Sequence, residues 1–234
     1  NSDLLHFAHT ISHDLREPLR GLLCHLQVLE TSHEQRWDSA SREVLHFAMQ
    51  SGHQMSEMID GLLEYARIGR PGKAFGWADS GRALQKALLN LRQSILETNA
   101  EILSDSLPEV QADEVQLMQL FQNLIDNALR FHGSGKPKVL VGWEENELEW
   151  IFSVADNGIG IDGKYHEKVF DFFQRLHNPE SYGGGGIGLA ICRRIIERHG
   201  GRIWVESKPG EGATVRFSIP KRAKGAKIEG TPDA

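Results

Sequence analysis

The chain has 234 residues, which allows one large domain or two small ones, and 40% of the residues are apolar, enough to build a core. Its formal net charge of −6 excludes the basic excess of proteins that bind nucleic acid or anionic lipid. No apolar run approaches the roughly 20 residues that cross a bilayer, so we expect no membrane segment. Cys24 and Cys192 lie far apart on different predicted elements, which favours free thiols in a reducing compartment, the cytoplasm.

Residues 1–69 show the apolar periodicity of two long helices. In the first helix, apolar residues recur at steps of three or four from Leu4 to Leu29. Residues 31–37 interrupt this pattern, and Asp38 or Ser39 can cap the second helix. The apolar stripe of the second helix consists of Leu45, Ala48, Gly52, Met55, Ile59, Leu62 and Ala66. Two helices alone bury too little surface, so we expect an antiparallel hairpin that forms a dimeric four-helix bundle; the alternative is a hairpin that rests on the next domain.

The rest of the chain follows a linker at residues 70–76 and mixes helices with strands. We expect Asp79 to cap a helix that reaches Glu97, and Asp113 with Gln116 resembles a capping box for a helix ending near residue 132. Further predicted elements are a helix over 187–199, ended by two glycines, and two hairpins with strands at 138–143, 147–155, 202–206 and 214–219. Helices on one face of a mixed sheet, an α/β sandwich, are therefore predicted for residues 77–220, with a disordered tail at 221–234.

His13 stands inside the first predicted helix, in the sequence Ser-His-Asp-Leu-Arg-Glu-Pro-Leu. Pro18 has no N–H for the carbonyl of Asp14, and its ring crowds that carbonyl, so we expect a kink one turn after His13. An ordinary proline bend beside a surface histidine is the alternative interpretation, and this motif alone does not exclude it.

Asn123, Asn127 and Arg130 share one face of the helix predicted after Asp113. Asparagine is a mediocre residue inside a helix, so two of them on one face need a polar partner. Their side-chain carbonyls are hard oxygen ligands of the kind that Mg²⁺ takes together with phosphates and water. A solvated helix face is the alternative.

Asp156 follows a predicted strand and begins the sequence Asp-Asn-Gly-Ile-Gly-Ile, in which Gly158 and Gly160 permit a close approach of a ligand. An ionised carboxylate only accepts hydrogen bonds. It therefore suits the exocyclic amino group of adenine and repels the carbonyl oxygen at the same place in guanine. A simple turn at the end of a strand is the alternative.

The clearest signal is the glycine run at residues 183–186, followed by Ile-Gly-Leu, which opens directly into a helix. Backbone N–H groups at a helix N-terminus with glycine access form an anion site. The spacing is that of neither a Walker A loop nor a Rossmann turn. We therefore expect a phosphate cradle rather than a flexible linker. The aromatic segment at 170–176 and this glycine run bracket a segment that can act as a mobile lid.

With these five motifs in this order, residues 1–220 resemble the catalytic core of the sensor histidine kinases of two-component systems. The matching segments are the H box around His13, the N box at 123–131, the G boxes at 156–161 and 184–189, and the F box at 170–176. Residues 210–214 look like the late Gly-x-Gly-x-Thr element. The form of the H box is similar to the phytochrome-like branch, which implies a light or redox sensor upstream.

The resemblance implies two domains and two cofactors. Residues 1–69 would be a dimerisation and histidine-phosphotransfer domain, and residues 77–220 an ATP-binding domain with the Bergerat fold. The cofactors are ATP and Mg²⁺, and the reaction is autophosphorylation on His13 followed by transfer to an aspartate of a response-regulator receiver domain. The implied assembly is a homodimer whose upstream sensor domain is absent from this chain.

The resemblance also implies the catalytic residues. His13 is the nucleophile, Asp14 takes its other ring proton, and Asn123 is the Mg²⁺ ligand, with Asn127 nearby. From the helix geometry alone, adjacent residues point about 100° apart, whereas Glu17 shares the face of His13, so Glu17 stays open as the rival base.

For the nucleotide, the resemblance implies that Asp156 reads adenine and that Phe131, often tyrosine in the family, stacks on the nucleotide. Arg130, usually lysine, should contact phosphate, and Arg175 should reach the γ-phosphate from the lid. Gly185 replaces a usual threonine or serine, which can loosen the loop. The other implied ATP-site residues are Gly158, Gly160, Gly184, Gly186, Gly188, Leu189 and Thr214.

Two other functional classes compete with a kinase. A Bergerat ATPase that hydrolyses ATP to drive a conformational change would not need a kinked His-Asp helix before its nucleotide domain. A pseudokinase scaffold would not need an intact Asn123, Asp156 and glycine run.

Overall fold

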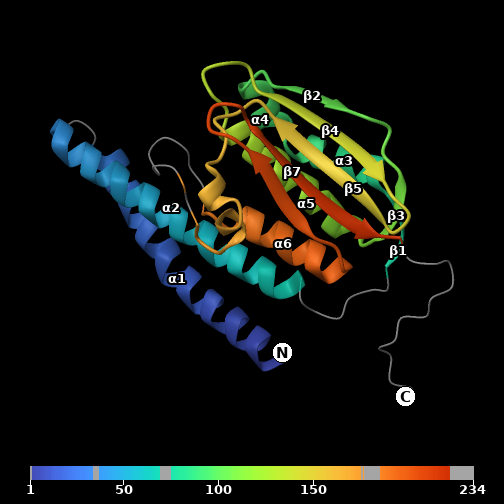
Figure 1. Cartoon of the computed structure of the whole chain (residues 1–234). Helices are drawn as coiled ribbons and strands as arrows, with labels where there is room; N and C mark the ends of the chain where they lie inside the picture. The colour runs from blue at the N-terminus through green and yellow to red at the C-terminus, as the bar shows by residue number, and fades with distance from the viewer. Residues whose placement is uncertain (1, 34–36, 69–74, 175, 177–184, 222–234) are drawn as a thin grey trace.

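Two long helices begin the chain in the computed structural model, which describes residues 2–33, 37–68, 75–174, 176 and 185–221 (Figure 1). Helix α1 (Ser2–His33) continues through Pro18 and runs two residues beyond the predicted interruption at Thr31. Helix α2 (Ser39–Ile68) begins where Asp38 accepts a hydrogen bond from the backbone N–H of Ser41 at 2.8 Å, as predicted for its cap. The predicted kink at Pro18 stays a prediction.

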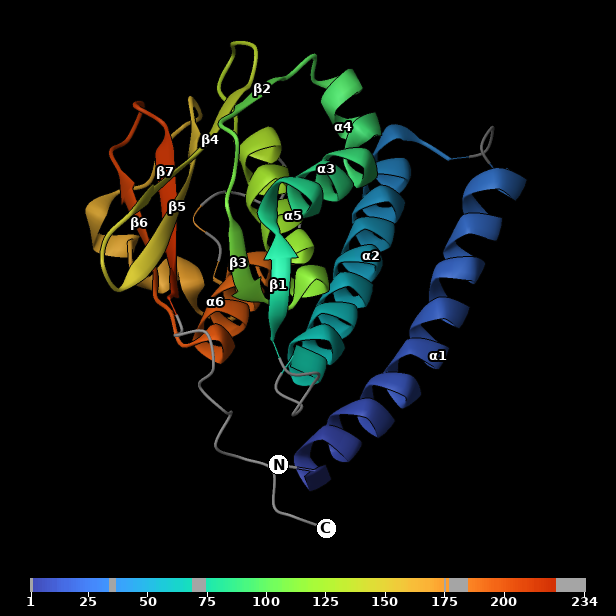
Figure 2. The same ribbon diagram turned by 90° about the vertical axis from the view of Figure 1, so that its right-hand side faces the viewer.

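The two helices pack side by side as an antiparallel hairpin (Figure 2). Gly52 permits the close approach, because a Cβ added there would lie 2.6 Å from Cδ2 of Leu23. Only part of the predicted apolar stripe of α2 is covered within the chain. Leu45 and Gly52 are buried, whereas Met55 and Leu62 remain exposed. The hairpin therefore retains an apolar face of the kind that a second copy can cover.

The second part of the chain is an α/β sandwich, as predicted. Its main sheet, within the described residues, has five strands in the order β2-β4-β5-β7-β6. The strand β2 is parallel to β4, and the other neighbours are antiparallel. The strands are β2 (Glu101–Ser104), β4 (Lys138–Glu145), β5 (Glu149–Asp156), β6 (Ile203–Ser207) and β7 (Ala213–Pro220).

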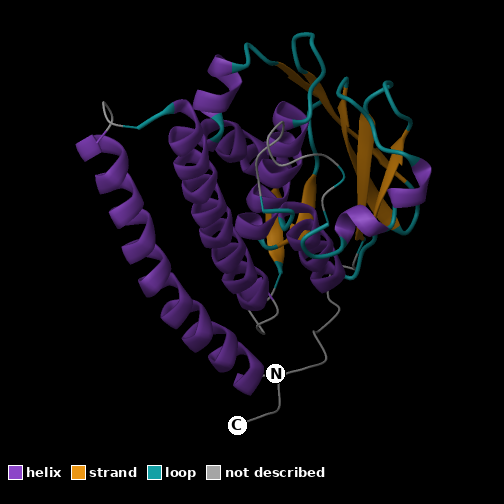
Figure 3. Cartoon of the chain, turned by 90° about the vertical axis from the view of Figure 1, so that its left-hand side faces the viewer, coloured by secondary structure: helices purple, strands orange, loops and turns teal. Residues whose placement is uncertain are grey.

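Helices α3, α5 and α6 lie on one face of this sheet, and α2 packs against α6 on the side away from the sheet (Figures 2 and 3). Phe121 of α5 meets Phe152 and Phe217 of the sheet, whose rings stack 5.0 Å apart in the core. The remaining elements are α3 (Ser80–Asn90), α4 (Arg92–Glu97), α5 (Glu114–Arg130), α6 (Gly188–His199), the strand pair β1 (Gly76–Asp79) with β3 (Glu109–Ala112), and the short 3₁₀ helices η1 (Gly163–Tyr165) and η2 (Lys168–Phe170).

Several local predictions need correction. The helix predicted from Asp79 to Glu97 is two helices, because Leu91 leaves the helical conformation with φ −90° and ψ 5°. The strands β1, β2 and β3 were not predicted, and Gly76 at the end of the predicted linker belongs to β1. Asp113 caps α5, but the Gln116 side-chain oxygen has no hydrogen-bond partner, so the capping box is only half made.

Other predictions fall partly or wholly outside the described residues. These are residues 70–74 of the linker and residues 222–234 of the tail. None of the described helices is long and apolar enough to cross a membrane.

Candidate functional site

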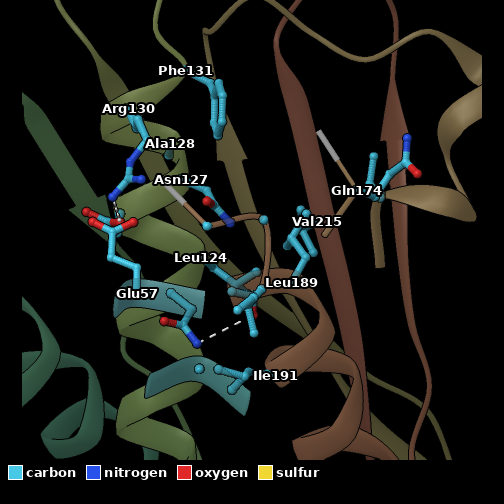
Figure 4. Close-up of a pocket in the computed structure, with 18 of the residues that line it drawn as sticks. Glu57, Leu124, Asn127, Ala128, Arg130, Phe131, Gln174, Leu189, Ile191 and Val215 are labelled. Carbon is cyan, nitrogen blue, oxygen red and sulfur yellow. Dashed lines mark hydrogen bonds and ion pairs between the residues drawn. The ribbon is translucent and has the colours of Figure 1, made fainter. Parts of the chain in front are cut away.

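A cavity of about 590 Å³ lies between α5, α6 and the sheet on one side and α2 on the other. Figure 4 shows side chains from these elements converging on it. This volume is in the range of sites that hold small molecules. The predicted site residues that line it are Asn123, Asn127, Arg130, Phe131, Asp156, Gly160, Gly186, Gly188 and Leu189. Gln174 and Leu176 of the aromatic segment line it too, so the structure brings together residues from four of the sequence motifs.

Asp156 ends strand β5, and its carboxylate is held by the backbone. Its Oδ1 accepts hydrogen bonds from the N–H of Gly158 at 2.8 Å and from the N–H of Ala213 at 3.2 Å. Burial raises the pKa of Asp156, and the two backbone hydrogen bonds oppose that rise. Both of these N–H groups bond the same carboxylate oxygen, Oδ1. The other oxygen, Oδ2, can therefore accept a hydrogen bond from a ligand. The arrangement suits a ligand that donates an N–H.

Glycine is required at two positions of the turn after Asp156. A Cβ at Gly158 would lie 2.4 Å from the carbonyl oxygen of Phe131, so the turn packs directly on the end of α5. Gly160 has φ +72°, and a Cβ there would lie 2.0 Å from the carbonyl oxygen of Lys208. These close backbone contacts, rather than the approach of a ligand, explain why glycine is needed at positions 158 and 160.

The predicted polar face of α5 lines the cavity. Arg130 makes an ion pair with Asp126 at 2.8 Å, one helical turn before it. The Nδ2 of Asn123 approaches the carbonyl oxygen of Gly188 at 3.5 Å, a long contact at the start of α6. A Cβ at Gly188 would lie 3.9 Å from both Asn123 and Asn127, an ordinary contact distance, so the start of α6 lies directly beside the two amides.

The N-terminus of α6 borders this cavity, which Gly186, Ile187 and Gly188 line. Gly186 has φ +67°, and Ile187, the residue at the cap position, provides no side-chain hydrogen bond to the first turn. The N–H groups of the first turn of a helix carry partial positive charge and bind anions. Asparagine amides, a helix N-terminus and an acidic acceptor therefore surround one space.

Some predicted residues lie elsewhere or outside the described part. Thr214 lines a separate depression of about 240 Å³, whereas its strand neighbours Ala213 and Val215 line the main cavity. The side chains of His13 and Asp14, together with Arg175 and Gly184, lie outside the described residues.

The sequence did not predict the wall that α2 contributes. Glu57, Asp60, Gly61 and Glu64 line the cavity from this helix, and Arg16 of α1 makes an ion pair with Asp60 at its edge. Burial raises the pKa of Glu64. No local pattern marks these residues, because their proximity to the cavity depends on how the hairpin packs against α6.

Two family models match separate parts of this chain. The model "His Kinase A (phospho-acceptor) domain" matches residues 3–71, which include His13. The model "Histidine kinase-, DNA gyrase B-, and HSP90-like ATPase" matches residues 112–223, which include α5, the sheet strands from β4 on, and α6. The chain belongs to the histidine kinase family. Its order of domains is the one expected from the motifs.

The relatives of this histidine kinase chain include phytochromes. It is 48% identical to Cyanobacterial phytochrome A of Nostoc sp. and 45% identical to Phytochrome-like protein Cph1 of Synechocystis sp., each over 220 residues and 94% of this chain. The chain spans only 29% of the length of either relative. Among solved structures, full-length ShkA in complex with AMPPNP is similar with a TM-score of 0.66 and 27% identity, covering 92% of this chain and 45% of that one.

Proposed function

We propose that this histidine kinase core transfers the γ-phosphoryl group of ATP to its own His13. The observation that carries the proposal is the cavity in which Asp156, the α5 asparagines and the N-terminus of α6 meet, in a chain whose phospho-acceptor match contains His13. Residues 1–69 would form the phosphotransfer domain and residues 77–220 the ATP-binding domain. The reaction consumes ATP, so we place it in the cytoplasm.

The cavity would bind the adenine base and the phosphates of the nucleotide through different residues. Oδ2 of Asp156 would accept a hydrogen bond from the adenine amino group, which guanine cannot donate at that place. Phe131, half-buried beside the cavity, offers a ring for stacking. The phosphates would lie against Gly186 and the α6 N-terminus, where Arg130 supplies positive charge.

The residues present fit a bound Mg²⁺ that also contacts phosphate. The described residues contain no cluster of three or more His, Cys, Asp or Glu side chains that could hold a metal by themselves. Mg²⁺ commonly takes one or two protein oxygens with phosphates and water, and Asn123, which lines the cavity, carries such an oxygen. When bound, the ion neutralises charge that develops on the phosphates.

His13 needs a base for its second ring proton as the phosphoryl group is transferred. We propose Asp14 for this task, because the family pattern assigns it. Glu17 lies one helical turn after His13 on α1, and this spacing places the two residues on the same face of the helix. Glu17 is exposed. Asp14→Asn should slow autophosphorylation by roughly 10²–10⁴-fold with little change in ATP affinity. Loss of that size in Glu17→Gln instead would show that Glu17 is the base.

After autophosphorylation, we propose that the phosphoryl group passes to an aspartate of a response-regulator receiver domain. The family of the chain supports this step. The same hairpin would dimerise, because Leu15, Leu22, Met55 and Leu62 leave an apolar surface exposed along α1 and α2.

One incubation with γ-labelled ATP distinguishes the proposal from the other classes. A kinase puts label on the protein, an ATPase releases it as phosphate, and a pseudokinase scaffold does neither. We expect label on the protein.

A further inference from the structure

Helix α2 packs directly on the glycine loop of the proposed ATP site. A Cβ added at Gly61 would lie 2.7 Å from Cδ1 of Ile187, so the absence of a side chain at Gly61 allows α2 to touch the residue that precedes α6. A Cβ at Gly185 would lie 3.6 Å from Cβ of Glu57 and 3.7 Å from Cγ of Met58. The loop that should hold phosphates is therefore covered by α2.

An aromatic contact holds the same two parts together further along α2. The rings of Tyr65 and Phe172, a residue of the F box, meet edge to face at 4.5 Å, and Arg194 of α6 lies 5.3 Å over the Tyr65 ring. The next residue, Phe173, has φ +58°, a conformation unfavourable for a bulky side chain. Its N–H donates to the carbonyl oxygen of Gly186 at 3.0 Å. The F box is thus attached both to α2 and to the glycine loop.

The α2 wall carries negative charge. Glu57, Asp60 and Glu64 line the cavity, as do Arg67 of the same helix and Arg16 of α1, which pairs with Asp60, so the two helices contribute three carboxylates against two guanidinium groups. In Figure 4 the Glu57 side chain extends from α2 toward Arg130, which already pairs with Asp126. Arg130 is the cation that should meet the nucleotide phosphates. A triphosphate entering this cavity would thus approach several carboxylates at short range, in surroundings less polar than water.

We propose that the docking of α2 and the binding of a nucleoside triphosphate oppose each other, because Glu57 and Glu64 present negative charge where the phosphates bind. This inference rests on the proposed ATP site. Binding free energies are coupled reciprocally, so a bound triphosphate should loosen α2 from Ile187, and any change that loosens α2 should tighten triphosphate binding. Released from α2, the ATP-binding domain is free to approach His13. Tyr65 and Gly61 are then positioning residues of the docked, resting arrangement.

The first test measures the affinity for Mg-AMPPNP, which is not hydrolysed, by calorimetry on the whole chain. Glu57→Gln should bind roughly tenfold more tightly than wild type, since one nearby negative charge is removed. Glu43→Gln is the matched control, because it removes the same charge from an exposed position near the start of α2. Its affinity should equal that of the wild type. Unchanged or weaker binding by Glu57→Gln would overturn the inference and leave the ATP site intact.

The second test changes docking without changing charge. Gly61→Ala adds a methyl group against Ile187, which should loosen α2 and tighten AMPPNP binding several-fold. Gly52→Ala adds the same group at the contact with α1 and should leave the affinity for AMPPNP unchanged. Hydrogen exchange gives an independent measure. AMPPNP should speed exchange in residues 57–65 while slowing it in α5. Protection of both segments by AMPPNP would contradict the antagonism. If neither the wild type nor any variant binds AMPPNP, both this inference and the proposed function are refuted.

Discussion

Replacing Asp156 with asparagine should separate nucleotide recognition from folding. The amide oxygen of Asp156→Asn can accept the hydrogen bonds from Gly158 and Ala213 that Oδ1 accepts now at 2.8 and 3.2 Å. The reverse orientation would set the amide NH₂ against two N–H donors. The side-chain nitrogen must therefore face the ligand, where it meets the adenine amino group as donor against donor.

The loss can be estimated from the hydrogen bond removed. A hydrogen bond to a charged acceptor contributes about 1.5–3 kcal/mol, which corresponds to about a 10- to 150-fold weaker affinity for ATP. Stability should not fall. Burial raises the pKa of Asp156 above its ordinary 3.8, so the folded chain takes up this proton more readily than the unfolded chain does. The ionised carboxylate therefore destabilises the fold at neutral pH, and this cost disappears as the pH falls through the raised pKa.

The assay is calorimetry with Mg-ATP and Mg-GTP on the wild type and on Asp156→Asn, with a thermal melt of each. The wild type should prefer ATP strongly, and the variant should lose that preference while melting no lower. In the wild type, ATP affinity should fall as the pH is lowered through the raised pKa of Asp156, because protonation adds a donor to the acceptor. Equal ATP affinity in the variant and the wild type would refute the reasoning.

Three further predictions concern the fold, the dimer and the reverse reaction. Gly158→Ala should lower stability and ATP affinity together, measured by melting and calorimetry, because its Cβ would lie 2.4 Å from the carbonyl oxygen of Phe131; an unchanged melt would contradict that contact. Met55→Asp combined with Leu62→Asp should give monomers in sedimentation, since charges cannot be buried unpaired in a bundle; a wild type that is monomeric at micromolar concentration would argue against the bundle. Glu17→Thr should speed phosphate release from the phosphorylated receiver, since a carboxylate repels a phosphoryl group; fast release by the wild type that Glu17→Ala abolishes would overturn this.

Elements marked by local chemistry could be predicted from the sequence. The caps at Asp38, Asp79 and Asp113 form because a side chain and the backbone N–H groups two or three residues later are all that they require. By contrast, β1 and β3 are four residues each and, within the described part of the chain, form a two-stranded sheet with one another, Gly76 opposite Ala112. Strands this short are fixed by a distant partner rather than by their own residues.

The candidate site shows the same division. Asp156, the α5 asparagines and the glycine run are contiguous motifs, and the fold brings them to one cavity. Thr214 belonged to a motif too, but alternation along β7 turns it away from Ala213 and Val215. The α2 wall could not be predicted, because the stripe containing Met55 and Leu62 indicated one packing face, while Gly61 and Leu63 are buried elsewhere on the helix.

The most direct measurement of the central claim locates the phosphoryl group. The wild type and His13→Gln are incubated with γ-labelled Mg-ATP. One portion of each labelled protein is treated with acid, a second with base, and a third is digested for peptide mapping. A phosphorylated histidine is predicted: label that acid removes and base does not, confined to the peptide containing His13, and absent from His13→Gln. Label that survives acid, or that persists in His13→Gln, would contradict the account.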